Sequence, residues 1–461
     1  MFLVAGLWAP SLVQAQGFGV YEQGSCAMAR AGAAVADGCS DGSSIYFNPA
    51  NISSTSGITV SLGGTLIAAQ GSYTSGITGR ESDLQNDPIP VPHLYATYRA
   101  NDRLTVGLGT YVPYGLSTEW KSTFEGAFEG YNNAVQSIYI QPTISYQVTD
   151  WLTIGGGPIL SLSAVELQQR LDLSQQLASG GDTPDTNDDV YFSQLGIPFH
   201  TAFGDTKLEA TNETGFGGNI GVNVRATERL QFGARFMTPI TVDFSGDATF
   251  TQVNTGLRLR TALGPNIPAG TPIDNLVADQ FSGDETLTNQ SIETELTFPA
   301  QVVVGTSFNA TPQLTVTADY QWTGWSAVGE IPLDFEKDAL DDERVLNYEN
   351  TSAIRVGGQY QLNDRLSLRA GYLYNESAAP DATVTPLLPE AGRNQFTLGF
   401  GWRPVDLLEV NAAYQYLGQN DRLGRVRDVR VGEEVSSLSE LNEGIYSFDA
   451  HLVGLTLTLY L

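Results

Sequence analysis

The chain has 461 residues and a formal net charge of −28, and this excess of acidic side chains argues against nucleic acids and anionic lipid surfaces as partners. Hydrophobic residues make up 41% of the sequence, but no run of about 18 apolar residues follows the N-terminus, which argues against a helical membrane protein. There are 49 glycines, and aromatic residues reach 10%, as expected for twisted strands with aromatic girdles.

Residues 1–15 have the features of a secretory signal peptide. Their apolar stretch has the length of a signal h-region, and Val13-Gln14-Ala15 is an acceptable small-residue cleavage site. A positively charged n-region is missing, so either the true start lies further upstream or the export signal is atypical. The alternative interpretation is the start of a buried helix, because a short apolar run does not separate the two.

Residues 16–56 are rich in glycine and alanine and are too few to build a hydrophobic core of their own. A short segment of this kind ahead of a long series of strands predicts a plug, or hatch, inside a barrel. It contains both cysteines of the chain, Cys26 and Cys39. An even pair in an exported protein predicts a disulfide, which would add roughly 3 kcal/mol of stability in the chain-entropy description. Because no histidine or third thiol lies nearby, we expect no metal site.

Residues 57–461 alternate between apolar and small or polar side chains with a period of two. One face of each strand is therefore apolar. This pattern fits a membrane barrel, but any single strand of this kind also fits a soluble sandwich. We expect fourteen strands, at residues 57–70, 91–100, 103–114, 135–148, 151–171, 213–226, 229–244, 294–309, 312–328, 344–361, 365–377, 393–403, 406–417 and 446–461.

The connections between these strands alternate in length. Tight turns are predicted at pairs such as Asn101-Asp102 and Asn363-Asp364, whereas residues 172–212 and 245–293 form long connections. Short turns on one side, long loops on the other and an even strand number are the signature of a bacterial outer-membrane barrel. The predicted fold is therefore all-β: a 14-stranded antiparallel transmembrane β-barrel (57–461) with a small hatch in its lumen, in a Gram-negative-type outer membrane.

Several short motifs are informative as a set. They are Ala29-Arg30-Ala31-Gly32, Ala36-Asp37, Asn48-Pro49-Ala50, Tyr114-Gly115-Leu116-Ser117-Thr118-Glu119, Phe298-Pro299 and Leu388-Pro389-Glu390. Together they resemble the FadL family (OMPP1/FadL/TodX) of outer-membrane transporters for fatty acids and other hydrophobic compounds. The resemblance implies a movable hatch that is anchored in the lumen by Asn48, Pro49 and Ala50.

The hatch contains two candidate functional sites, the turn at Asn48-Pro49 and the side chain of Phe18. Pro49 forces Asn48 out of the helical region, and an asparagine side chain can hold a turn by bonding its own backbone. The alternative is a plain turn that leads into the first strand. Phe18 lies close to the new N-terminus, where the resemblance implies that it reaches the tail of the bound ligand; the alternative is a loose chain end.

Two long loops are unusually apolar for exposed segments. Residues 190–203 include Phe192 and Phe199, and residues 271–281 predict a short helix with Thr271 as N-cap and Pro272 as first residue. An exposed apolar patch usually marks a binding surface, so these loops are candidates for capturing a hydrophobic ligand. The alternative is that the loops pack on each other as a lid. The candidate contacts in the helix are Ile273, Leu276, Val277 and Phe281.

A carboxylate ligand needs a cation. The chain has only 23 lysines and arginines, and Arg170 and Arg344 lie near the positions where the resemblance implies head-group contacts. The alternative is that each is an ordinary lumen or loop charge, since such charges are common and pair weakly.

The third predicted strand contains a break. Pro113 has no N–H to give to a neighbouring strand, and Gly115 can adopt conformations that bend the strand inward. Unpaired backbone in a membrane wall is tolerable only where it lines a cavity, which predicts a lateral opening for cargo that prefers the bilayer to water. The alternative is a strand that has already left the membrane at Pro113.

These features predict passive diffusion of hydrophobic molecules, most of all long-chain fatty acids, across the outer membrane. We expect no enzyme activity, because no Gly-x-Ser-x-Gly motif or metal-binding histidine pair is present. We also expect no cofactor. The expected partners are the cargo, outer-membrane lipid and lipopolysaccharide, with no nucleic acid, and the expected state is a monomer. The alternatives are an aromatic-hydrocarbon channel of the same family and a structural or adhesive barrel that transports nothing.

Overall fold

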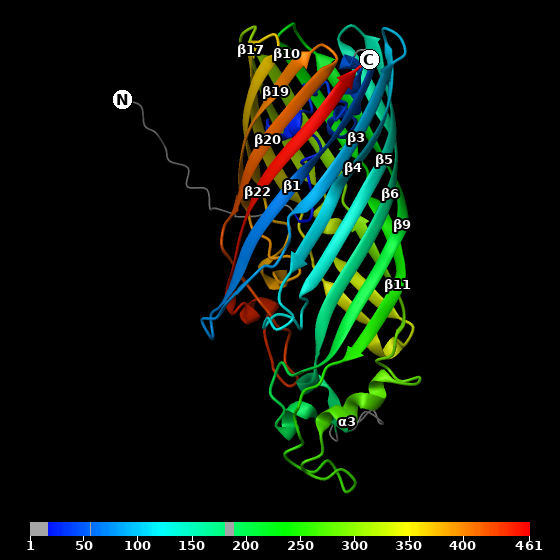
Figure 1. Ribbon diagram of the computed structural model, residues 1–461, viewed down its shortest axis with the longest axis vertical. Coiled ribbons are helices and arrows are strands. Elements are labelled where there is room, and N and C mark those ends of the chain that lie inside the picture. Colours follow the sequence, from blue (N-terminus) through cyan, green and yellow to red (C-terminus); the bar gives the residue numbers. More distant parts are fainter. Residues whose placement is uncertain (1–16, 56, 180–188) are drawn as a thin grey trace, which may run out of the picture.

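The computed structural model describes residues 17–55, 57–179 and 189–461. They form a closed antiparallel barrel of 14 long strands, which are tilted relative to the barrel axis, with a small plug inside it (Figure 1). The first strand pairs with the last one from Thr59–Tyr460 to Ser75–Gly444, and this pairing closes the barrel. The predicted fold class is confirmed. The predicted signal peptide, residues 1–15, lies outside the described residues.

The barrel strands are named in chain order. Two of them consist of two segments each. They are β1 (Ile58–Ser75), β3 (Ile89–Arg99), β4 (Leu104–Glu119), β5 (Asn132–Thr149), β6 (Leu152–Asp172), β9 (Ala202–Arg225), β10 (Leu230–Met237) with β11 (Ile240–Gln252), β12 (Gln290–Phe298) with β13 (Gln301–Asn309), β14 (Leu314–Thr323), β17 (Thr351–Asn363), β18 (Leu366–Asn375), β19 (Arg393–Val405), β20 (Leu408–Gln419) and β22 (Gly444–Tyr460).

The two ends of the barrel differ. Turns of a few residues connect the strands at one end, near the C-terminus, whereas long loops fill the other end (Figure 1). Among the described residues, no helix is both long and apolar enough to cross a bilayer. The loops carry the short elements β2 (Glu81–Asp83), η2 (Leu173–Gln175), β7 (Leu177–Ser179), β8 (Val190–Tyr191), η4 (Phe192–Leu195), α3 (Ile273–Val277), η5 (Ala278–Phe281), η6 (Trp325–Ala327), β15 (Glu330–Phe335), η7 (Asp338–Leu340), β16 (Asp342–Val345), η8 (Asp381–Thr383), β21 (Arg422–Gly424) and η9 (Leu438–Leu441).

The barrel has its apolar face outside. Leu62 and Leu398 are each 62% exposed on the outer wall, while their neighbours Ser61 and Thr397 are buried against the lumen. A soluble sandwich would bury the apolar face instead, so this arrangement excludes that alternative and fits a wall that faces lipid. The exposed apolar side chains lie mostly toward the short-turn end, and the wall beyond them carries polar and acidic residues such as Asp243.

The plug comprises the described residues from Gly17 to Thr55. It contains α1 (Ser25–Met28), α2 (Ser44–Phe47) and the 3-10 helix η1 (Pro49–Ser54), and it lies inside the barrel (dark blue in Figure 1). Nearly all of its residues are buried. Since helices of four residues have no stability of their own, the barrel wall supplies the contacts that hold the plug together.

The strand predictions differ from the structure mainly at four places. The sixth predicted strand (213–226) begins already at Ala202, as β9, because residues 202–210 pair with β6 and β11. The seventh predicted strand (229–244) is interrupted between β10 and β11, and the eighth (294–309) between β12 and β13, because prolines 239 and 299 cannot donate to the ladder. The tenth strand begins at Thr351 rather than at 344. Residues 342–345 instead pair with β15 in a loop hairpin, from Glu330–Val345 to Leu333–Asp342.

Candidate functional site

Asn48 ties the plug to the barrel wall. Its side-chain nitrogen donates to the carbonyl oxygens of Val35 (2.6 Å) and Val222 (3.0 Å), and its side-chain oxygen accepts from the backbone N–H of Ala50 (3.1 Å). The wall is built for close approach here, since a Cβ at Gly221 would lie 2.0 Å from the Asn48 oxygen. The turn thus bonds within the plug, as predicted, and also contacts β9; η1 then separates it from β1.

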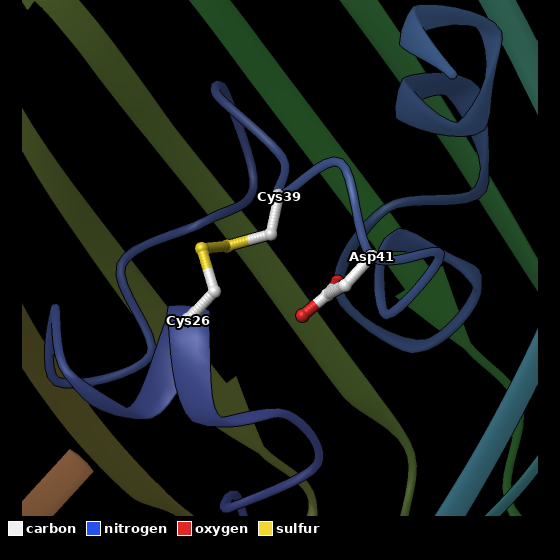
Figure 2. A group of neighbouring side chains, drawn as sticks. All are labelled: Cys26, Cys39 and Asp41. Carbon is white, nitrogen blue, oxygen red and sulfur yellow. A yellow bond between two sulfur atoms is a disulfide. The ribbon is translucent and has the colours of Figure 1, made fainter. Parts of the chain in front are cut away.

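The disulfide between Cys26 and Cys39 links two halves of the plug, as predicted, with Cα atoms 6.2 Å apart. Figure 2 shows it beside Asp41, which accepts from the backbone N–H of Ser43 (3.0 Å). Neither cysteine is therefore available as a free thiol. The neighbouring carboxylate is used to shape the turn before α2.

The wall is interrupted where β4 bends. The pairing of β3 with β4 stops at Leu94–Thr110, although β3 continues along β1 as far as Ile89. A bulge then separates Tyr111 from Tyr114 in the pairing of β4 with β5. Beyond Thr110, β4 has therefore left β3, and the edge between them lacks a ladder. Pro113 and Gly115 lie in this bent segment.

The start of the plug occupies the freed edge of β4. Val20 N–H donates to the carbonyl of Pro113 (2.8 Å), and Gly115 N–H donates to the carbonyl of Phe18 (2.9 Å). The side chain of Gln23 completes the edge, because it donates to the Val112 carbonyl (2.6 Å) and accepts from the Val112 N–H (3.1 Å). We call residues 17–20 the latch. It covers the bent part of β4 from the inside.

An apolar cavity of about 160 Å³ lies beside the latch, toward the loop end. Phe18 is one wall of it and packs edge-on against Trp325, with ring centroids 4.8 Å apart. Most of the lining residues are aliphatic or aromatic, which suits a hydrophobic guest, and the polar ones are Asn133, Glu166, Glu209, Thr294 and Arg344. The lining includes Phe18, Leu116, Val135, Val165, Leu208, Phe244, Leu296, Ile331, Arg344, Leu346, Tyr348, Leu387 and Leu388.

Of the two predicted cations, Arg344 lines this cavity. Its guanidinium bonds to the side chain of Gln169 and lies 4.0 Å from the carboxylates of Glu129 and Asp342. Burial is the main reason that the pKa of Glu129 is raised to about 7, and Asp428 adds to it. Within the described residues, the Nε of Arg344 is buried and has no hydrogen-bond partner.

Arg170 lies elsewhere. Its guanidinium forms an ion pair with Asp205 (2.8 Å), donates to the carbonyl of Ser122 (3.3 Å) and covers the ring of Tyr131. It is not among the residues that line the cavity in the described part of the chain. The two arginines are thus not brought together at one site.

The predicted loop contacts form a second core. Phe192, Ile273 and Val277 are buried in a cluster with residues of β9, β11 and β12, while Leu276 and Phe281 pack against its edge. The predicted helix exists as α3 followed by η5, but Pro272 is its N-cap and Ile273 its first residue. Loops with so many apolar side chains bury them against one another, so the segments form a lid, which is the alternative left open above.

Phe199 lies apart from that cluster. Its ring stacks on His200, 4.0 Å away, and the guanidinium of Arg430 lies over it at 4.1 Å. The side chain is half-buried between two loops. It therefore joins loops to each other rather than facing the cavity.

Glu390 is a functional candidate that sequence reasoning missed as a single residue. It is fully buried and accepts from the backbone N–H groups of Ala378 (3.2 Å), Ala379 (3.0 Å) and Gly17, so it holds the first described residue of the latch. Burial raises its pKa to about 7. The signal was present in the motif Leu388-Pro389-Glu390, but its contact with Gly17 spans 373 residues of sequence.

A closed barrel with an apolar outer band, a plug in its lumen and an apolar cavity above the plug defines a plugged outer-membrane β-barrel. Residues 6–459 match the model of the family described as outer membrane protein transport protein (OMPP1/FadL/TodX), and the chain belongs to this family. The family predicted from the hatch motifs is confirmed, and so is the location in a Gram-negative outer membrane.

Two relatives show the range of the family. The chain is 25% identical to outer membrane protein P1 of Haemophilus influenzae over 378 residues, which cover 80% of this chain and 74% of that protein. It is 21% identical to the long-chain fatty acid transport protein of Salmonella typhi over 447 residues, covering 94% of this chain and 91% of that protein.

Two solved structures share the fold. A FadL homologue of Pseudomonas aeruginosa has a TM-score of 0.78 and 19% sequence identity, covering 96% of this chain and 100% of that one. The toluene transporter TodX of P. putida has a TM-score of 0.67 and 19% identity, covering 97% and 99%. At these identities the likeness shows the fold alone.

Proposed function

We propose that this protein moves hydrophobic molecules by passive diffusion across the outer membrane, and that long-chain fatty acids are its main cargo. The observation that carries the proposal is the apolar cavity beside the latch. It offers a hydrophobic guest a dry site inside the barrel, next to a bent wall strand. Among the described residues we find nothing that suggests energy coupling or catalysis, and transport is the activity in the family's description.

Arg344 favours a fatty acid over a hydrocarbon. A guanidinium that lines an apolar cavity, with its Nε lacking a hydrogen-bond partner among the described residues, can bind a carboxylate with a charge-assisted hydrogen bond. The name of the Salmonella relative agrees with this cargo, whereas that of TodX favours aromatic hydrocarbons. A cargo with both a long tail and a carboxylate would use the whole of the cavity.

The route we propose starts at the lid and ends in the membrane. Cargo enters under the apolar loops that contain Phe192, Phe199, Ile273, Leu276, Val277 and Phe281. It then occupies the cavity against Phe18. It leaves sideways where β4 has parted from β3, once the latch is displaced from Pro113 and Gly115. A sideways exit suits such cargo because the tail never has to be fully hydrated.

The direct test is to identify the molecule that the native protein carries. Purified barrel should release fatty acids on extraction with organic solvent, detected by mass spectrometry, at close to one per protein. A variant with Leu296→Asp places a charge in the cavity wall and should release none, while Leu398→Ala on the outer wall should behave like the wild type. Wild-type protein that carries no hydrophobic molecule would instead favour a structural barrel.

A further inference from the structure

The barrel wall has a second interruption, far from β4. β9 pairs with β10 from Arg225–Gln231 to Asn219–Met237, and with β11 only from Glu209–Asp247 onward. Within the described residues, no ladder joins residues 240–246 of β11 to β9. On its other side β9 remains paired with β6 along almost its whole length. β9 therefore lacks ladder hydrogen bonds only on the side that faces β11, within the described residues.

The partner of this segment also has a free edge. β11 pairs with β12 from Ile240–Phe298 to Ala248–Gln290. β12 in turn pairs with β15 at Ile292 and Glu293, and in the described part of the chain no ladder joins residues 294–298 to the next strand. We call residues 240–246 and 292–298 the ribbon. Its two strands are bonded to each other but are largely unbonded along both outer edges.

Backbone features explain why the ribbon separates. Thr238-Pro239 and Pro299-Ala300 break the two strands at the same level, because proline gives no N–H to a ladder. On the facing strand, Asn212 has a φ of 64°, in the left-handed region, at a bulge in the pairing with β6. Three separate irregularities thus meet at one place in the wall.

The outer surface is hollowed over the ribbon. A dent of about 430 Å³ is lined by the outward-facing side chains of the ribbon and flanked by Glu213 of β9 and by Pro332 and Asp334 of β15. Its floor includes Phe244 and Thr294, and these two residues also line the apolar cavity. The ribbon therefore lies between the cavity and the outer surface.

The dent lies at the edge of the lipid-facing band. Phe216 of β9 is 77% exposed on the outer wall, three residues from Glu213, and the exposed Phe236 of β10 belongs to the same band. Beyond them the outer face of the ribbon is acidic. The ribbon's unbonded backbone groups can then be hydrated, which would be costly inside the hydrocarbon layer.

We propose that the ribbon is a second lateral opening, through which uncharged hydrophobic molecules pass between the outer edge of the membrane and the apolar cavity. The proposal rests on the proposed hydrophobic uptake. Displacing the ribbon breaks few ladder bonds, because its edges have few to lose. Phe244, which is 1% exposed, is the side chain that has to move.

The charges of the dent select the cargo. Five carboxyl groups line it, from Glu213, Asp243, Glu293, Glu295 and Asp334, and no basic residue does so among the described residues. A cleft lined with one sign of charge changes the encounter rate of an ion by about tenfold or more, and here it repels a carboxylate. Fatty acids are thereby left to the route past Arg344, and hydrocarbons gain a route of their own.

Thiol labelling tests the opening without measuring transport. In Phe244→Cys the new thiol is the only free one, because the two native cysteines form a disulfide. We expect N-ethylmaleimide to label it in the folded protein in lipid vesicles. Adding Ser245→Trp, which fills the dent, should slow labelling by about tenfold. A tenfold slower rate corresponds to a free-energy barrier that is higher by about 1.4 kcal/mol.

The matched control is Thr249→Trp, an outward position on the same strand but outside the dent, where β11 is paired with β9. It should leave the labelling rate unchanged. Equal rates for Ser245→Trp and Thr249→Trp would overturn the proposal. If Phe244→Cys fails to fold, Thr294→Cys reports from the opposite strand of the ribbon. Because labelling needs no cargo, its result is independent of whether the wild type takes up hydrophobic molecules.

An anionic sulfonated maleimide tests the charge selection. Relative to an exposed reference thiol in Thr249→Cys, it should label Phe244→Cys more slowly than the neutral reagent does, by at least about tenfold. The same relative rate for both reagents would contradict a carboxyl-lined path.

Discussion

Arg344 and Arg170 carry the same charge in different surroundings. Arg170 is held by Asp205 at 2.8 Å, whereas Arg344 lines the apolar cavity and its nearest carboxylates are 4.0 Å away. A cation that is already paired gains little from a second anion. The apolar surroundings of Arg344 therefore matter more than its charge alone.

Replacing Arg344 with alanine should weaken the binding of a long-chain fatty acid by about tenfold to a hundredfold. The reason is the loss of a hydrogen bond to a charged group, which contributes about 1.5–3 kcal/mol. Binding of an alkane of equal length should change little. Fluorescent-ligand displacement on purified protein measures both. Arg170→Ala is the matched control and should leave both affinities unaltered. An equal loss for acid and alkane would remove Arg344 from the head-group role.

Glu390 gives the latch a dependence on pH. Burial raises its pKa to about 7, above the value of about 4.3 in an unfolded chain, so the folded state binds the proton more tightly. The contribution of this carboxyl group to stability is complete below about pH 4 and is lost as the pH rises through about 7.

We therefore expect the latch to open more readily at about pH 8 than at about pH 5. Hydrogen exchange of the amides of residues 17–20, corrected for the intrinsic rate, measures the opening. Glu390→Gln stays neutral and should show no such difference. If wild type and variant respond to pH alike, Glu390 does not control the latch.

At the scale of elements, the sequence predicted the strands better than their interruptions. Period-two alternation and turn pairs are local, so the number of strands and the hatch could be predicted. The breaks at Pro239 and Pro299 depend on which strands are neighbours, and the prediction ran two strands straight through them. The hairpin of β15 and β16 was missed for the same reason, since residues 342–345 have their partners in the preceding segment.

The candidate site was predicted in part. Phe18 and Arg344 line the cavity, and Cys26 and Cys39 are bonded. The apolar loop residues were expected at a binding surface, but Ile273 and Val277 are buried within the lid. Composition could not decide between these arrangements, because both need the same apolar side chains. The contact of Glu390 with Gly17 spans 373 residues of sequence, and no local pattern indicates it.

Straightening β4 tests the proposed exit. Pro113→Thr together with Gly115→Val would let β4 rejoin β3 and should abolish uptake of fatty acids, while binding from outside persists. An added Cβ at Gly115 meets nothing closer than 3.7 Å, so the variant should fold. Pro142→Thr in β5, outside the opening, is the control. Normal fatty-acid uptake by the double variant would place the route down the lumen instead.

Asn48 is one of many residues that bond the plug to the wall, and Asn48→Ala should loosen the plug locally. The carbonyl of Val222 would lose the Asn48 donor, at a cost of about 1–3 kcal/mol, while the carbonyl of Val35 keeps a donor from Asn51 (3.0 Å). Uptake should fall, because the latch is the start of the same plug, while the barrel stays folded by heat-modifiable gel mobility. Asn101→Ala, in a short turn, should transport normally. Unchanged uptake by Asn48→Ala would reduce Asn48 to a local turn residue.

At the scale of the whole molecule, polarity is arranged in layers. The outer wall has an apolar band, the lumen around the plug is polar, and the cavity on the loop side of the plug is mostly apolar. A hydrophobic molecule thus has two favourable positions, in the cavity and in the bilayer, separated by a short stretch of bent wall. The proposed passive diffusion would run between these two positions, with the bilayer as the larger reservoir.

The most direct test of this account is the dependence of binding on the length of the cargo. Each buried methylene contributes about 0.8 kcal/mol, so removing four carbons from a long-chain fatty acid should weaken binding by roughly two orders of magnitude. A displacement series over even-numbered fatty acids measures it. We predict a steep, regular loss of affinity as the chain shortens; an affinity that does not depend on chain length would contradict a hydrophobic cargo site.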